Sequence, residues 1–560
     1  MGSYDYPRYD YVRPEALNAN APERHPVVIV GAGPVGLSAA ADFALRGVET
    51  VVLDDDDTVS LGSRAICWSK RTLEIFDRLG AGERMLDTGV LWKLGRIFHG
   101  EDELYNFDML PEPGHRMPAF VNLQQYYTEE YLVDRVNELG RTEIRWKNKV
   151  IGVSMLEDGG AKLEVETPDG RYMIEADYVL AADGVRSEIR RQMGLDFKGK
   201  VFEDRFLIAD IQMKADFPSE RWFWFEPPFH KGQSVLLHRQ ADNVFRVDFQ
   251  LPSSVDPDEE KKPENVIPRL KAMFGPEVAF DLEWVSVYTF TCRRMERFRH
   301  GPVFFVGDSA HVVSPFGARG GNGGVQDTDN LVWKMCLVMQ GAAPDRLLDT
   351  YDDERLPATD ENLLNSTRST DFLTPKSQAS LDFRQAVLAL AKRHDFARRL
   401  VNSGRLSLPH TYVDTPLSTP DVDGFSGTMQ PGSPAADAPV AFDGKAGWLL
   451  NALDGDFTLM VFADAVGREI VASLAGGSPS VRTLLVSTQS GELEDGRVVV
   501  DVDGLARERY DAEPGTVYLI RPDQHVAARW RQIDLNKLQA ALSRATATGA
   551  ASTARHAVGG

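Results

Sequence analysis

The sequence predicts an α/β protein in which a Rossmann-like domain is interleaved with an antiparallel sheet and followed by a C-terminal α/β domain. Three observations lead to this fold class. A strand, a glycine-rich turn, a helix and a second strand follow one another in HPVVIVGAGPVGLSAAADFALRGVETVVLDDDD. Segments rich in aromatic and β-branched residues, separated by turn formers, lie between residues 201 and 291. After residue 440, apolar strands alternate with helical patterns.

Composition and charge exclude several classes of protein. The 560 residues include 62 basic and 83 acidic side chains, which gives a net charge of −21 at pH 7. A field of this sign opposes association with nucleic acid and with anionic membranes. The three cysteines, Cys67, Cys292 and Cys336, are too few and too scattered for a disulfide framework or a metal site. We therefore expect a soluble cytoplasmic protein with no metal, no nucleic-acid partner and no membrane association.

The N-terminal 24 residues predict an arm rather than a targeting segment. They lack an apolar core of the length that a signal peptide needs, and they contain four tyrosines. Such a segment is expected to lie extended on a surface, either of its own subunit or of a neighbouring one. The most apolar window, residues 26–45, is broken by glycines and by Asp42, so it predicts a buried strand and a helix rather than a membrane span.

The first glycine cluster, GAGPVG, has the context of a dinucleotide-binding turn. Gly31, Gly33 and Gly36 stand between a β-branched strand and an Ala-rich helix, where missing side chains let the backbone approach a pyrophosphate. The helix N-terminus adds about half a positive charge there. Asp54 ends the following strand, where an acid binds ribose hydroxyls and disfavours a 2′-phosphate. The segment therefore predicts an FAD or NAD site rather than an NADP site.

Two later strands also end in polar turns. ADGVRS places Asp183 and Arg186 in one turn, and VGDSAH supplies Asp308. A second glycine cluster follows in PFGARGGNGGVQD, ahead of a helix predicted from near Val325. The backbone amides of residues 320–324 are placed to stabilise an anion at the head of that helix. Because this cluster lacks a βαβ unit and an acid of its own, it does not predict a second nucleotide site.

Three motifs of the chain resemble those of the single-component FAD-dependent aromatic hydroxylases, which include para-hydroxybenzoate hydroxylase and phenol hydroxylase. In chain order they are GAGPVG, ADGVRS and VGDSAHVVSPFGARGGNGGVQD. The resemblance covers about residues 25–360. It implies a Rossmann-like FAD-binding domain interleaved with an antiparallel-sheet substrate domain. It also implies a homodimeric monooxygenase that uses NADPH or NADH and O2 to hydroxylate a phenolic substrate through a flavin hydroperoxide. Phenols, phenolic acids and polycyclic intermediates all remain open as substrates.

The resemblance also assigns FAD contacts. The glycines of GAGPVG would hold the pyrophosphate, Asp54 the adenosine ribose and Asp308 the ribityl chain. The full set of implied FAD-binding residues is Gly31, Gly33, Gly36, Asp54, Arg64, Gln125, Asp183, Arg186, Asp308, Gly320, Gly321 and Asn322.

Several of these assignments have alternatives. A surface ion pair competes for Arg64, and Gln124 is a one-residue alternative to Gln125. Arg186 is expected either to bind FAD, to bind a transient NADPH, or to form a structural ion pair with Asp183. His311 is expected to be a structural histidine rather than a base.

The loop before the second glycine cluster is expected to border the flavin. Pro315 and Phe316 would wall the side of the ring where oxygen adds. Arg319 departs from the family pattern, and its partner is open between flavin, substrate and solvent.

The antiparallel strands are expected to supply the substrate pocket. Strand alternation puts Arg246, Asp248 and Gln250 on one face, and His238 with Gln240 on one face of the neighbouring strand. A phenol must lose its proton to become nucleophilic, and a side chain that accepts this proton accelerates the reaction by about 10²–10⁴-fold. His238, Gln240 and Asp248, together with Pro315, are therefore the predicted catalytic set. The period-two tryptophans Trp222 and Trp224 are expected in the core, with ring-stacking walls as the alternative.

The chain beyond the hydroxylase-like region predicts a linker and a further domain. Residues 415–439 are rich in Pro, Gly, Ser and Asp, as linkers are. The cysteine-free unit after them resembles the thioredoxin-like domain of the phenol hydroxylase branch, which implies packing and subunit contact rather than dithiol chemistry. The predicted boundaries are 1–24 for the arm; 25–84, 119–197 and 292–350 for the FAD-binding domain; 85–118, 198–291 and 351–410 for the substrate domain and a helical segment; 411–439 for the linker; 440–545 for the thioredoxin-like domain; and 546–560 for a disordered tail.

Two other functions compete with hydroxylation. RWFWFEPP is similar to the WxWxIP signature of flavin-dependent halogenases, but Glu226 stands where that signature has isoleucine. A halogenase would also need a separate reductase and halide. A non-catalytic flavin-binding protein would hold FAD without ligand-stimulated consumption of NAD(P)H.

Overall fold

The computed structural model describes residues 4–62, 64–252, 254–401, 406–442, 444–453, 455–463, 481–491, 496–532 and 535–549. The chain divides into two compact units. The first comprises Met1–Pro111, Met117–Thr328 and Thr359–Leu408, and the second comprises Glu112–Arg116, Asp329–Ala358 and Pro409–Gly560. Residues 464–480 of the predicted thioredoxin-like domain and most of the expected tail at 546–560 lie outside the described residues.

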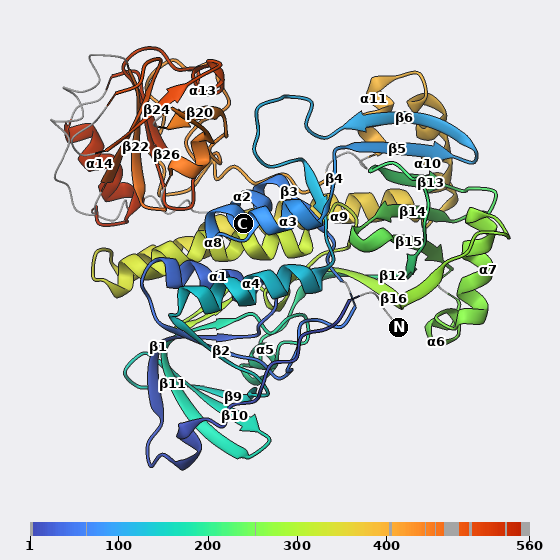
Figure 1. The fold of residues 1–560 in the computed structure, drawn as a ribbon, viewed down its shortest axis with the longest axis horizontal. Coiled ribbons are helices and arrows are strands. Elements are labelled where there is room, and N and C mark those ends of the chain that lie inside the picture. The colour runs from blue at the N-terminus through green and yellow to red at the C-terminus, as the bar shows by residue number, and fades with distance from the viewer. Residues whose placement is uncertain are drawn as a thin grey trace. The chain divides into compact units, whose positions relative to one another are not determined.

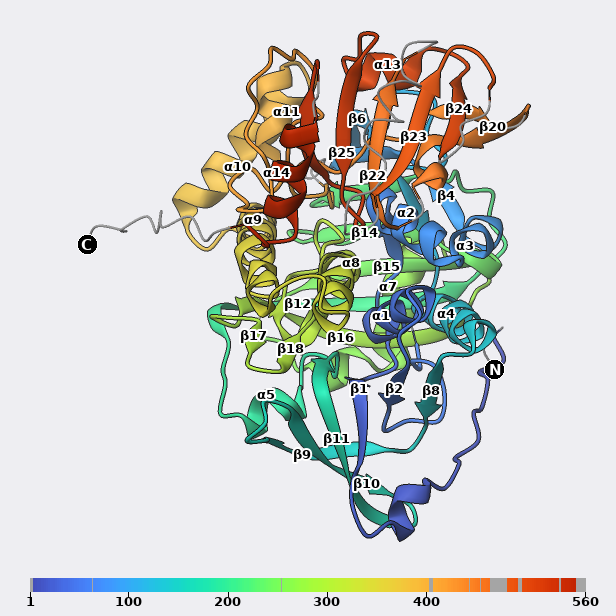
Figure 2. The same ribbon diagram turned by 90° about the vertical axis from the view of Figure 1, so that its left-hand side faces the viewer.

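A largely parallel sheet forms the Rossmann-like part of the first unit. Its strand order is β17-β18-β11-β1-β2-β8, and β10 and β9 extend it from β11. Helices α1 (Pro34–Leu45) and α4 (Gln125–Leu139) lie side by side next to this sheet (Figures 1 and 2). The strands are β1 (Glu23–Val30), β2 (Thr50–Leu53), β8 (Thr142–Arg145), β9 (Lys149–Met155), β10 (Ala161–Thr167), β11 (Gly170–Ala181), β17 (Arg299–His300) and β18 (Val303–Phe305).

The central strand of this sheet is buried on both faces. Val27, Val28 and Ile29 are fully buried, as expected for a β-branched run between parallel neighbours. Helix α1 begins directly after β1 and the glycine turn, with Gly33 as its N-cap and Pro34 at its first position. The sequence prediction of a βαβ unit is confirmed.

A second sheet, mostly antiparallel, forms the substrate domain. Its strand order is β19-β16-β12-β15-β14-β13-β5-β6, and only β13 and β5 pair in parallel among the described strands of this sheet. The strands are β5 (Leu94–His99), β6 (Asp102–Asp108), β12 (Lys198–Gln212), β13 (Arg221–Phe225), β14 (Ser234–Arg239), β15 (Val244–Leu251), β16 (Asp281–Arg294) and β19 (His311–Val312).

The two faces of this sheet differ in chemistry. One packs its apolar side chains against helix α7 (Pro263–Phe274), where Val266 and Leu270 are fully buried, and α6 (Pro257–Glu260) precedes that helix. We call the opposite face the substrate face. It carries the polar side chains Asp210, Arg221, His238, Arg246 and Asp248.

A small sheet and several helices complete the first unit. The sheet has the order β3-β7-β4. The segment 351–410, which was expected to contain a helical part, ends in two helices, α10 and α11. The elements are β3 (Cys67–Ser69), β4 (Val90–Trp92), β7 (Phe120–Asn122), α2 (Lys70–Leu79), α3 (Gly82–Thr88), α5 (Glu188–Gln192), α10 (Gln378–Ala391) and α11 (Asp395–Val401), with the 3₁₀ helices η1 (Glu15–Asn18), η2 (Ala241–Asn243) and η3 (Gly307–Ser309). Helices α8 (Gly320–Met339) and α9 (Thr350–Leu373) contribute residues to both units.

The N-terminal arm lies on its own first unit. Tyr4 stacks on Tyr126 of α4, with ring centroids 4.1 Å apart, and Tyr9 stacks on Trp146 at 4.4 Å. The Tyr6 hydroxyl accepts a hydrogen bond from the Gly62 amide at 3.1 Å. The sequence predicted that the arm covers either its own subunit or a neighbouring one. In the structure it covers its own subunit.

The second unit is built on a sheet with the order β21-β20-β24-β23-β22-β25-β26. Strands β22, β23 and β24 are parallel, and β25 and β26 add antiparallel pairs at one side. The elements are β20 (Pro439–Phe442), β21 (Lys445–Trp448), β22 (Phe457–Phe462), β23 (Val481–Ser487), β24 (Arg497–Asp501), β25 (Thr516–Ile520), β26 (Val526–Trp530), α13 (Leu505–Arg509) and α14 (Leu535–Ala545), with the 3₁₀ helices η4 (Asp345–Leu347) and η5 (Leu449–Ala452).

The predicted linker at 411–439 is instead an integral part of the second unit. The Thr419 amide donates to the Ala527 carbonyl at 2.8 Å, and the Gly432 amide donates to the Val526 carbonyl at 2.7 Å. Leu417 is buried in the apolar core of the unit. Its linker-like composition misled the prediction because its backbone polar groups pair with β26 rather than with water.

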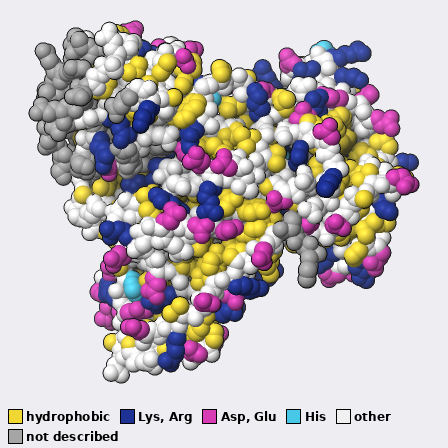
Figure 3. All heavy atoms as spheres, viewed as in Figure 1, with side chains coloured by type: hydrophobic (Ala, Val, Ile, Leu, Met, Phe, Trp, Pro, Cys, Tyr) yellow, Lys and Arg dark blue, Asp and Glu magenta, His cyan; other side chains and the backbone are white. Residues whose placement is uncertain are grey.

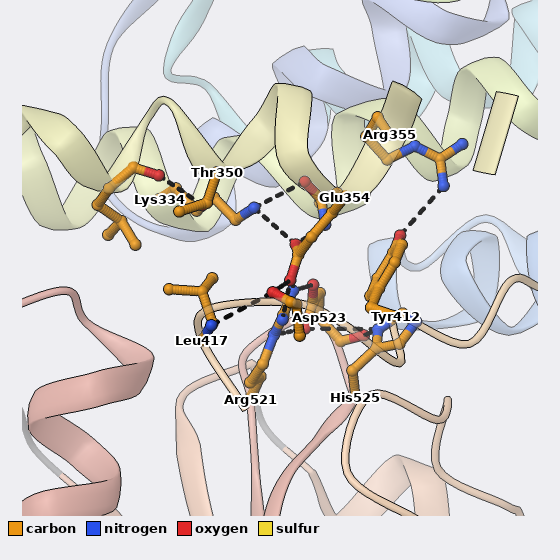
Figure 4. A network of polar contacts seen from close by, with 12 residues as sticks. Lys334, Thr350, Glu354, Arg355, Tyr412, Leu417, Arg521, Asp523 and His525 are labelled. Atoms are coloured by element: carbon orange, nitrogen blue, oxygen red, sulfur yellow. Dashed lines mark hydrogen bonds and ion pairs between the residues drawn. The ribbon is translucent and has the colours of Figure 1, made fainter. Parts of the chain in front are cut away.

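A network of buried charges joins helices α8 and α9 to the β25–β26 turn inside the second unit (Figure 4). Glu354 accepts hydrogen bonds from Arg521 at 2.5 and 3.0 Å and from the Lys334 ammonium at 2.7 Å. Arg521 also pairs with Asp523 at 2.5 Å, and all four side chains are fully buried. Each buried charge therefore has an opposite partner.

Candidate active site

The turn after β1 is shaped by two glycines. Gly31 has φ of +107°, and a Cβ there would lie 2.5 Å from the Ala182 carbonyl oxygen. A Cβ on Gly36 would lie 2.0 Å from the Gly31 oxygen. Neither position has room for a side chain, so both glycines are required by the packing of the turn itself.

Gly33 differs from its neighbours because the protein leaves space in front of it. The nearest atom to a Cβ on Gly33 is a Glu129 carboxylate oxygen at 4.0 Å. The residue is also the N-cap of α1 and makes no side-chain cap hydrogen bond. Unfilled space before free helix amides is the cradle that a pyrophosphate occupies, so the turn fits FAD.

Asp54 stands at the end of β2 beside this turn. Its carboxylate accepts hydrogen bonds from the Ala32 amide at 2.6 Å and the Asp56 amide at 2.9 Å. Burial raises its pKa to about 6. Asp54 therefore stabilises the glycine turn, at the place where the sequence predicted a ribose-binding acid.

Glu129 is an acid of this site that the sequence analysis missed. Its carboxylate accepts hydrogen bonds from the Ser60 amide at 2.6 Å, the Ser60 hydroxyl at 2.7 Å and the Gln125 amide at 2.8 Å. Burial raises its pKa to about 7. The available signal was its position four residues after Gln125, on the same face of α4.

The two candidate glutamines point to different domains. The Gln125 side chain accepts from the Ala65 amide at 3.0 Å, next to Arg64, and also contacts Ser60. The Gln124 side chain donates to the Ala241 carbonyl at 3.2 Å, in the substrate domain. Gln125 thus lies with the loop that carries Arg64, and Gln124 does not.

The ADGVRS turn is organised by capping interactions. The Asp183 carboxylate accepts from the Ile189 amide at 3.2 Å, and the Ser187 hydroxyl accepts from the Arg190 amide at 3.0 Å, so both cap α5. Arg186 is exposed. Within the described residues it makes no ion pair with Asp183, so the structural pairing that the sequence left open is not present.

Asp308 follows β18 and lies in the 3₁₀ helix η3. Its side chain is reachable by water, yet the surrounding protein raises its pKa through desolvation. The preceding Gly307 has φ of +61°, and its amide donates to Asp327 at 3.0 Å. His311 donates from Nε2 to the same carboxylate at 2.7 Å and is buried, which agrees with the structural role expected for it.

The second glycine cluster forms the first turn of α8 rather than a loop before it. The helix begins at Gly320, five residues earlier than predicted. A Cβ on Gly324 would lie 2.6 Å from Val35 and 2.9 Å from the Gly307 Cα, so this glycine allows α8 to cross close to α1 and η3. A Cβ on Gly321 would lie 3.2 Å from the Trp68 ring. Close packing therefore explains part of the cluster, and the helix N-terminus still presents backbone amides.

Asn322 is held by the protein. Its side chain accepts from the Ser69 amide at 2.9 Å and hydroxyl at 3.1 Å, and it donates to the Cys67 carbonyl at 2.8 Å and the Ala318 carbonyl at 2.6 Å. Only its backbone amide is left to meet a cofactor.

The residues around the cluster have distinct places. Arg319 is 5% exposed and donates to Asn362 of α9 at 3.4 Å, so it does not face solvent. Pro315 is exposed, whereas Phe316 is buried against Phe206 of β12 with ring centroids 4.9 Å apart.

A row of polar side chains crosses the substrate face at right angles to the strands. Arg221 on β13 pairs in register with His238 on β14, His238 with Arg246 on β15, and Arg246 with Asp210 on β12. Arg246 forms a bidentate ion pair with Asp210 at 2.7 and 2.8 Å. The Gln240 side chain donates to the same Asp210 at 3.2 Å. His238, Gln240 and Asp248 thus share one face of the sheet. Alternation grouped His238 with Gln240 and Asp248 with Arg246 within their own strands, and the cross-strand register brings the two groups together.

The protonation of His238 follows from its contact with Asn122. The Asn122 oxygen accepts from the Trp92 indole N–H at 2.8 Å, so its amide NH₂ faces the Arg239 carbonyl at 2.9 Å and the His238 Nδ1 at 3.4 Å. His238 Nδ1 is then an acceptor, and the proton is on Nε2. Burial and the neighbouring arginines hold the pKa of His238 well below its ordinary value, so the ring is neutral.

Asp248 lies beside this row. It has an exposed fraction of 9%, and its Oδ1 atom is buried without a hydrogen-bond partner in the described part of the chain. Desolvation raises its pKa to about 7, against the attraction of Arg246 and Arg221. An acid with this pKa exchanges a proton near neutral pH.

The tryptophans of RWFWFEPP are core residues. Trp224 packs with Phe98 and Phe229 on the α7 face of the sheet, and Trp222 packs against Phe217 there. Glu226, at the position where the halogenase signature has isoleucine, pairs with Arg384 of α10.

Comparison with known proteins identifies the family of the chain. The family described as FAD binding domain matches residues 24–366. The 6-methylpretetramide 4-monooxygenase of Streptomyces rimosus is 31% identical over 548 residues, which is 92% of each chain. The probable NADH-specific resorcinol 4-hydroxylase of Rhodococcus jostii is 27% identical over 517 residues, or 89% of this chain and 91% of that protein.

Solved structures share the fold. The flavin-dependent monooxygenase PieE, in complex with FAD and substrate, has a TM-score of 0.80 at 22% identity, covering 94% of this chain and all of that one. Aklavinone-11 hydroxylase, in complex with FAD and aklavinone, has a TM-score of 0.75 at 22% identity with the same coverage.

The chain therefore belongs to the FAD binding domain family. It is an FAD-dependent monooxygenase that hydroxylates an aromatic compound with O2 and a reduced nicotinamide nucleotide. The halogenase alternative and the non-catalytic alternative are set aside by this membership. In the described part of the chain, no helix has the length and apolar character of a membrane span, and no three side chains of the metal-binding types gather at one point.

Proposed function

We propose that the substrate is a phenol-type ring held on the substrate face, where Asp248 and His238 activate it and Gln240 helps to align it. The observation that carries this proposal is that an acid without a partner for one of its oxygens and a neutral histidine lie on the same sheet face. Asp248 has a pKa of about 7 and an oxygen without a partner. His238 offers an N–H on Nε2, because Nδ1 is already an acceptor.

These two groups suit the activation of a phenol. The Asp248 carboxylate accepts the phenolic proton, and the His238 N–H donates a hydrogen bond to the resulting oxygen. A raised acid pKa matches the proton to be moved better than that of an exposed aspartate, because transfer is most effective near the operating pH. The chemistry that FAD would supply when bound is the activation of O2, with NADPH or NADH as the reductant.

FAD is proposed to lie along the turns after β1, β2 and β18. Gly31, Gly33 and Gly36 would face the pyrophosphate, with Asp54 at the ribose and Asp308 at the ribityl chain. The open space before Gly33 and the exposed side chain of Asp308 support this course. The remaining contacts are assigned to Arg64, Gln125, Asp183, Arg186, Gly320, Gly321 and the Asn322 amide, with Pro315 beside the reacting ring.

A phenolic substrate agrees with the relatives, which are named for 6-methylpretetramide and resorcinol. We further propose that the enzyme is a cytoplasmic homodimer without nucleic-acid or membrane partners. The net charge of −21 supports the absence of nucleic-acid and anionic-membrane partners, and acidic and basic side chains are interspersed on the face drawn in Figure 3.

The proposal is tested by substituting the two activating residues. Purified enzyme is supplied with NADPH or NADH and a panel of phenolic compounds, and cofactor oxidation and hydroxylated product are both measured. Asp248→Asn should lower product formation by about 10²–10⁴. His238→Gln should raise the share of cofactor oxidation that yields no product. Unchanged coupling in both variants would place substrate activation elsewhere.

The cofactor assignment has its own test. Asp308→Ala removes a side chain that makes no hydrogen bond with the described residues, so the fold should be retained. The purified variant should be largely colourless. A variant with full flavin absorbance would reject Asp308 as a cofactor ligand.

A further inference from the structure

Arg221 on β13 is a buried cation of the substrate face that the preceding proposal does not use. Its exposed fraction is 6%, and its Nη1 atom is buried without a hydrogen-bond partner. Across the ranges that the structure describes, Arg221 forms no ion pair. Burial lowers its pKa, which records how unfavourable its charge is in this place.

Asp248 is the acid whose charge acts on Arg221, yet the two form no ion pair among the described residues. Two further acids of this part of the sheet are committed to other arginines. Glu220, the preceding residue, pairs with Arg96 at 2.6 Å. Asp210, in the same cross-strand row, is held by Nε and Nη2 of Arg246. Arg96 and Arg246 thus each have a carboxylate, whereas Arg221 has none within ion-pair distance among the described residues. A buried guanidinium with no acid is unfavourable unless a ligand supplies the negative charge.

The surroundings of Arg221 indicate the shape of that ligand. Its register partner is His238, which the proposed mechanism places at the reacting oxygen. Aromatic and aliphatic side chains border the row, with Phe223 and Leu236 on the substrate face and Trp92 stacked on Phe120 beside His238. Arg221 on β13 and Asp248 on β15 are separated by β14. Two strand spacings place these two strands about 10 Å apart. A flat ring system with oxygens at two places fits this arrangement.

We propose that Arg221 anchors an ionised acidic oxygen of the aromatic substrate, such as a carboxylate or an acidic enolate, while the ring position to be hydroxylated lies at His238 and Asp248. The inference rests on the proposed function, because it takes the substrate face as the binding surface. It adds that the enzyme selects aromatic compounds with an acidic group on or beside the ring. Arg221 binds and orients, and moves no proton.

The test uses two probes that differ by one acidic group. FAD-loaded enzyme is titrated with 1-hydroxy-2-naphthoate and with 1-naphthol, and binding is followed by the change in flavin absorbance. Wild-type enzyme should bind the acid at least tenfold more tightly than the neutral naphthol. Arg221→Met should lose this preference, with little change for 1-naphthol, and Arg221→Lys should keep part of it.

Stability separates an anchor from a structural arginine. Without ligand, Arg221→Met should unfold at an equal or higher temperature than wild type, because an unpaired buried charge is replaced by an apolar side chain. A clear drop in melting temperature or in FAD content would show a structural role and overturn the proposal. It is overturned equally if wild type binds the acid no more tightly than 1-naphthol, including no binding of the acid at all.

The outcomes also distinguish this inference from the proposed function. Loss of the proposed function would appear as unchanged product formation and coupling in Asp248→Asn and His238→Gln. Loss of the anchor would appear as binding that ignores the carboxylate, with the effects of those two variants unaltered. Each proposal can therefore fail alone.

Discussion

Arg246 forms a bidentate ion pair with Asp210 across two strands, whereas Asp248, two residues further on the same face, keeps an oxygen without a partner among the described residues. Arg246, the arginine nearest to Asp248 along β15, thus neutralises Asp210 instead of Asp248. This division leaves Asp248 with a pKa of about 7, which an ion-paired aspartate would not have.

The raised pKa of Asp248 predicts a pH dependence of stability. The folded state binds the Asp248 proton more tightly than the unfolded state, whose pKa is near 3.8. The free energy of unfolding should therefore fall as the pH rises from about 4 to about 7. Asp248→Asn removes this titration, so urea unfolding at pH 5 and pH 8 should differ less in the variant, by about 1–3 kcal/mol. An identical pH response in the two proteins would contradict the raised pKa.

The glycine turn allows structural and cofactor roles to be told apart. Gly36→Ala places a methyl group 2.0 Å from the Gly31 oxygen, so it should destabilise the protein by about 1–3 kcal/mol or more and lower FAD content. Gly33→Ala meets no protein atom closer than 4.0 Å and should leave the apoprotein as stable as wild type. Its FAD affinity, measured by quenching of flavin fluorescence, should nevertheless fall because the methyl group enters the cradle. Unaltered FAD binding by Gly33→Ala would move the pyrophosphate away from this turn.

The N-terminal arm is predicted to order the loop that carries Arg64. Tyr6 contacts Gly62, and the Pro7 carbonyl accepts from the Thr58 hydroxyl at 2.6 Å. Removal of residues 1–12 should weaken FAD binding roughly tenfold, because the loop must then be ordered by the cofactor itself. Tyr11→Phe is the matched control, since Tyr11 contacts Thr167 instead of this loop. Equal FAD release rates in truncated and full-length enzyme would show that the arm has no such role.

The buried charges of the second unit predict a large effect of a single neutralisation. Glu354→Gln leaves Lys334 and Arg521 without their shared carboxylate, and it should destabilise the unit by about 3–5 kcal/mol in urea unfolding. Arg482→Ala breaks an exposed pair with Asp456 in the same unit and should cost about 0–1 kcal/mol. If the two variants lose similar stability, the network does not hold α8 and α9 to the β25–β26 turn.

Much of the fold could be read from local pattern. The β-branched run before GAGPVG, the glycine spacing and the terminal acid Asp54 specify a βαβ unit, because each follows from neighbours within about 30 residues. Alternation likewise groups His238 with Gln240, and Asp248 with Arg246, each within its own strand, whereas the register between β14 and β15 sets both groups on one face. The linker prediction was wrong for the opposite reason. The composition of residues 411–439 favours a free tether, but β26, a hundred residues later, supplies hydrogen-bond partners that no local pattern reveals.

The sequence by itself determined the family, the cofactor and the kinds of residue at the site, because these depend on motifs that are continuous in the chain. Tertiary structure alone decided which of those residues are committed and which are free to act. The Asn322 side chain is engaged in hydrogen bonds to β3, and Arg246 forms an ion pair with Asp210. Asp248 Oδ1 and Arg221 Nη1 have no hydrogen-bond partner among the described residues. Partners of this kind come from strands and helices far apart in the sequence, and the protonation of a buried group depends on all of them together.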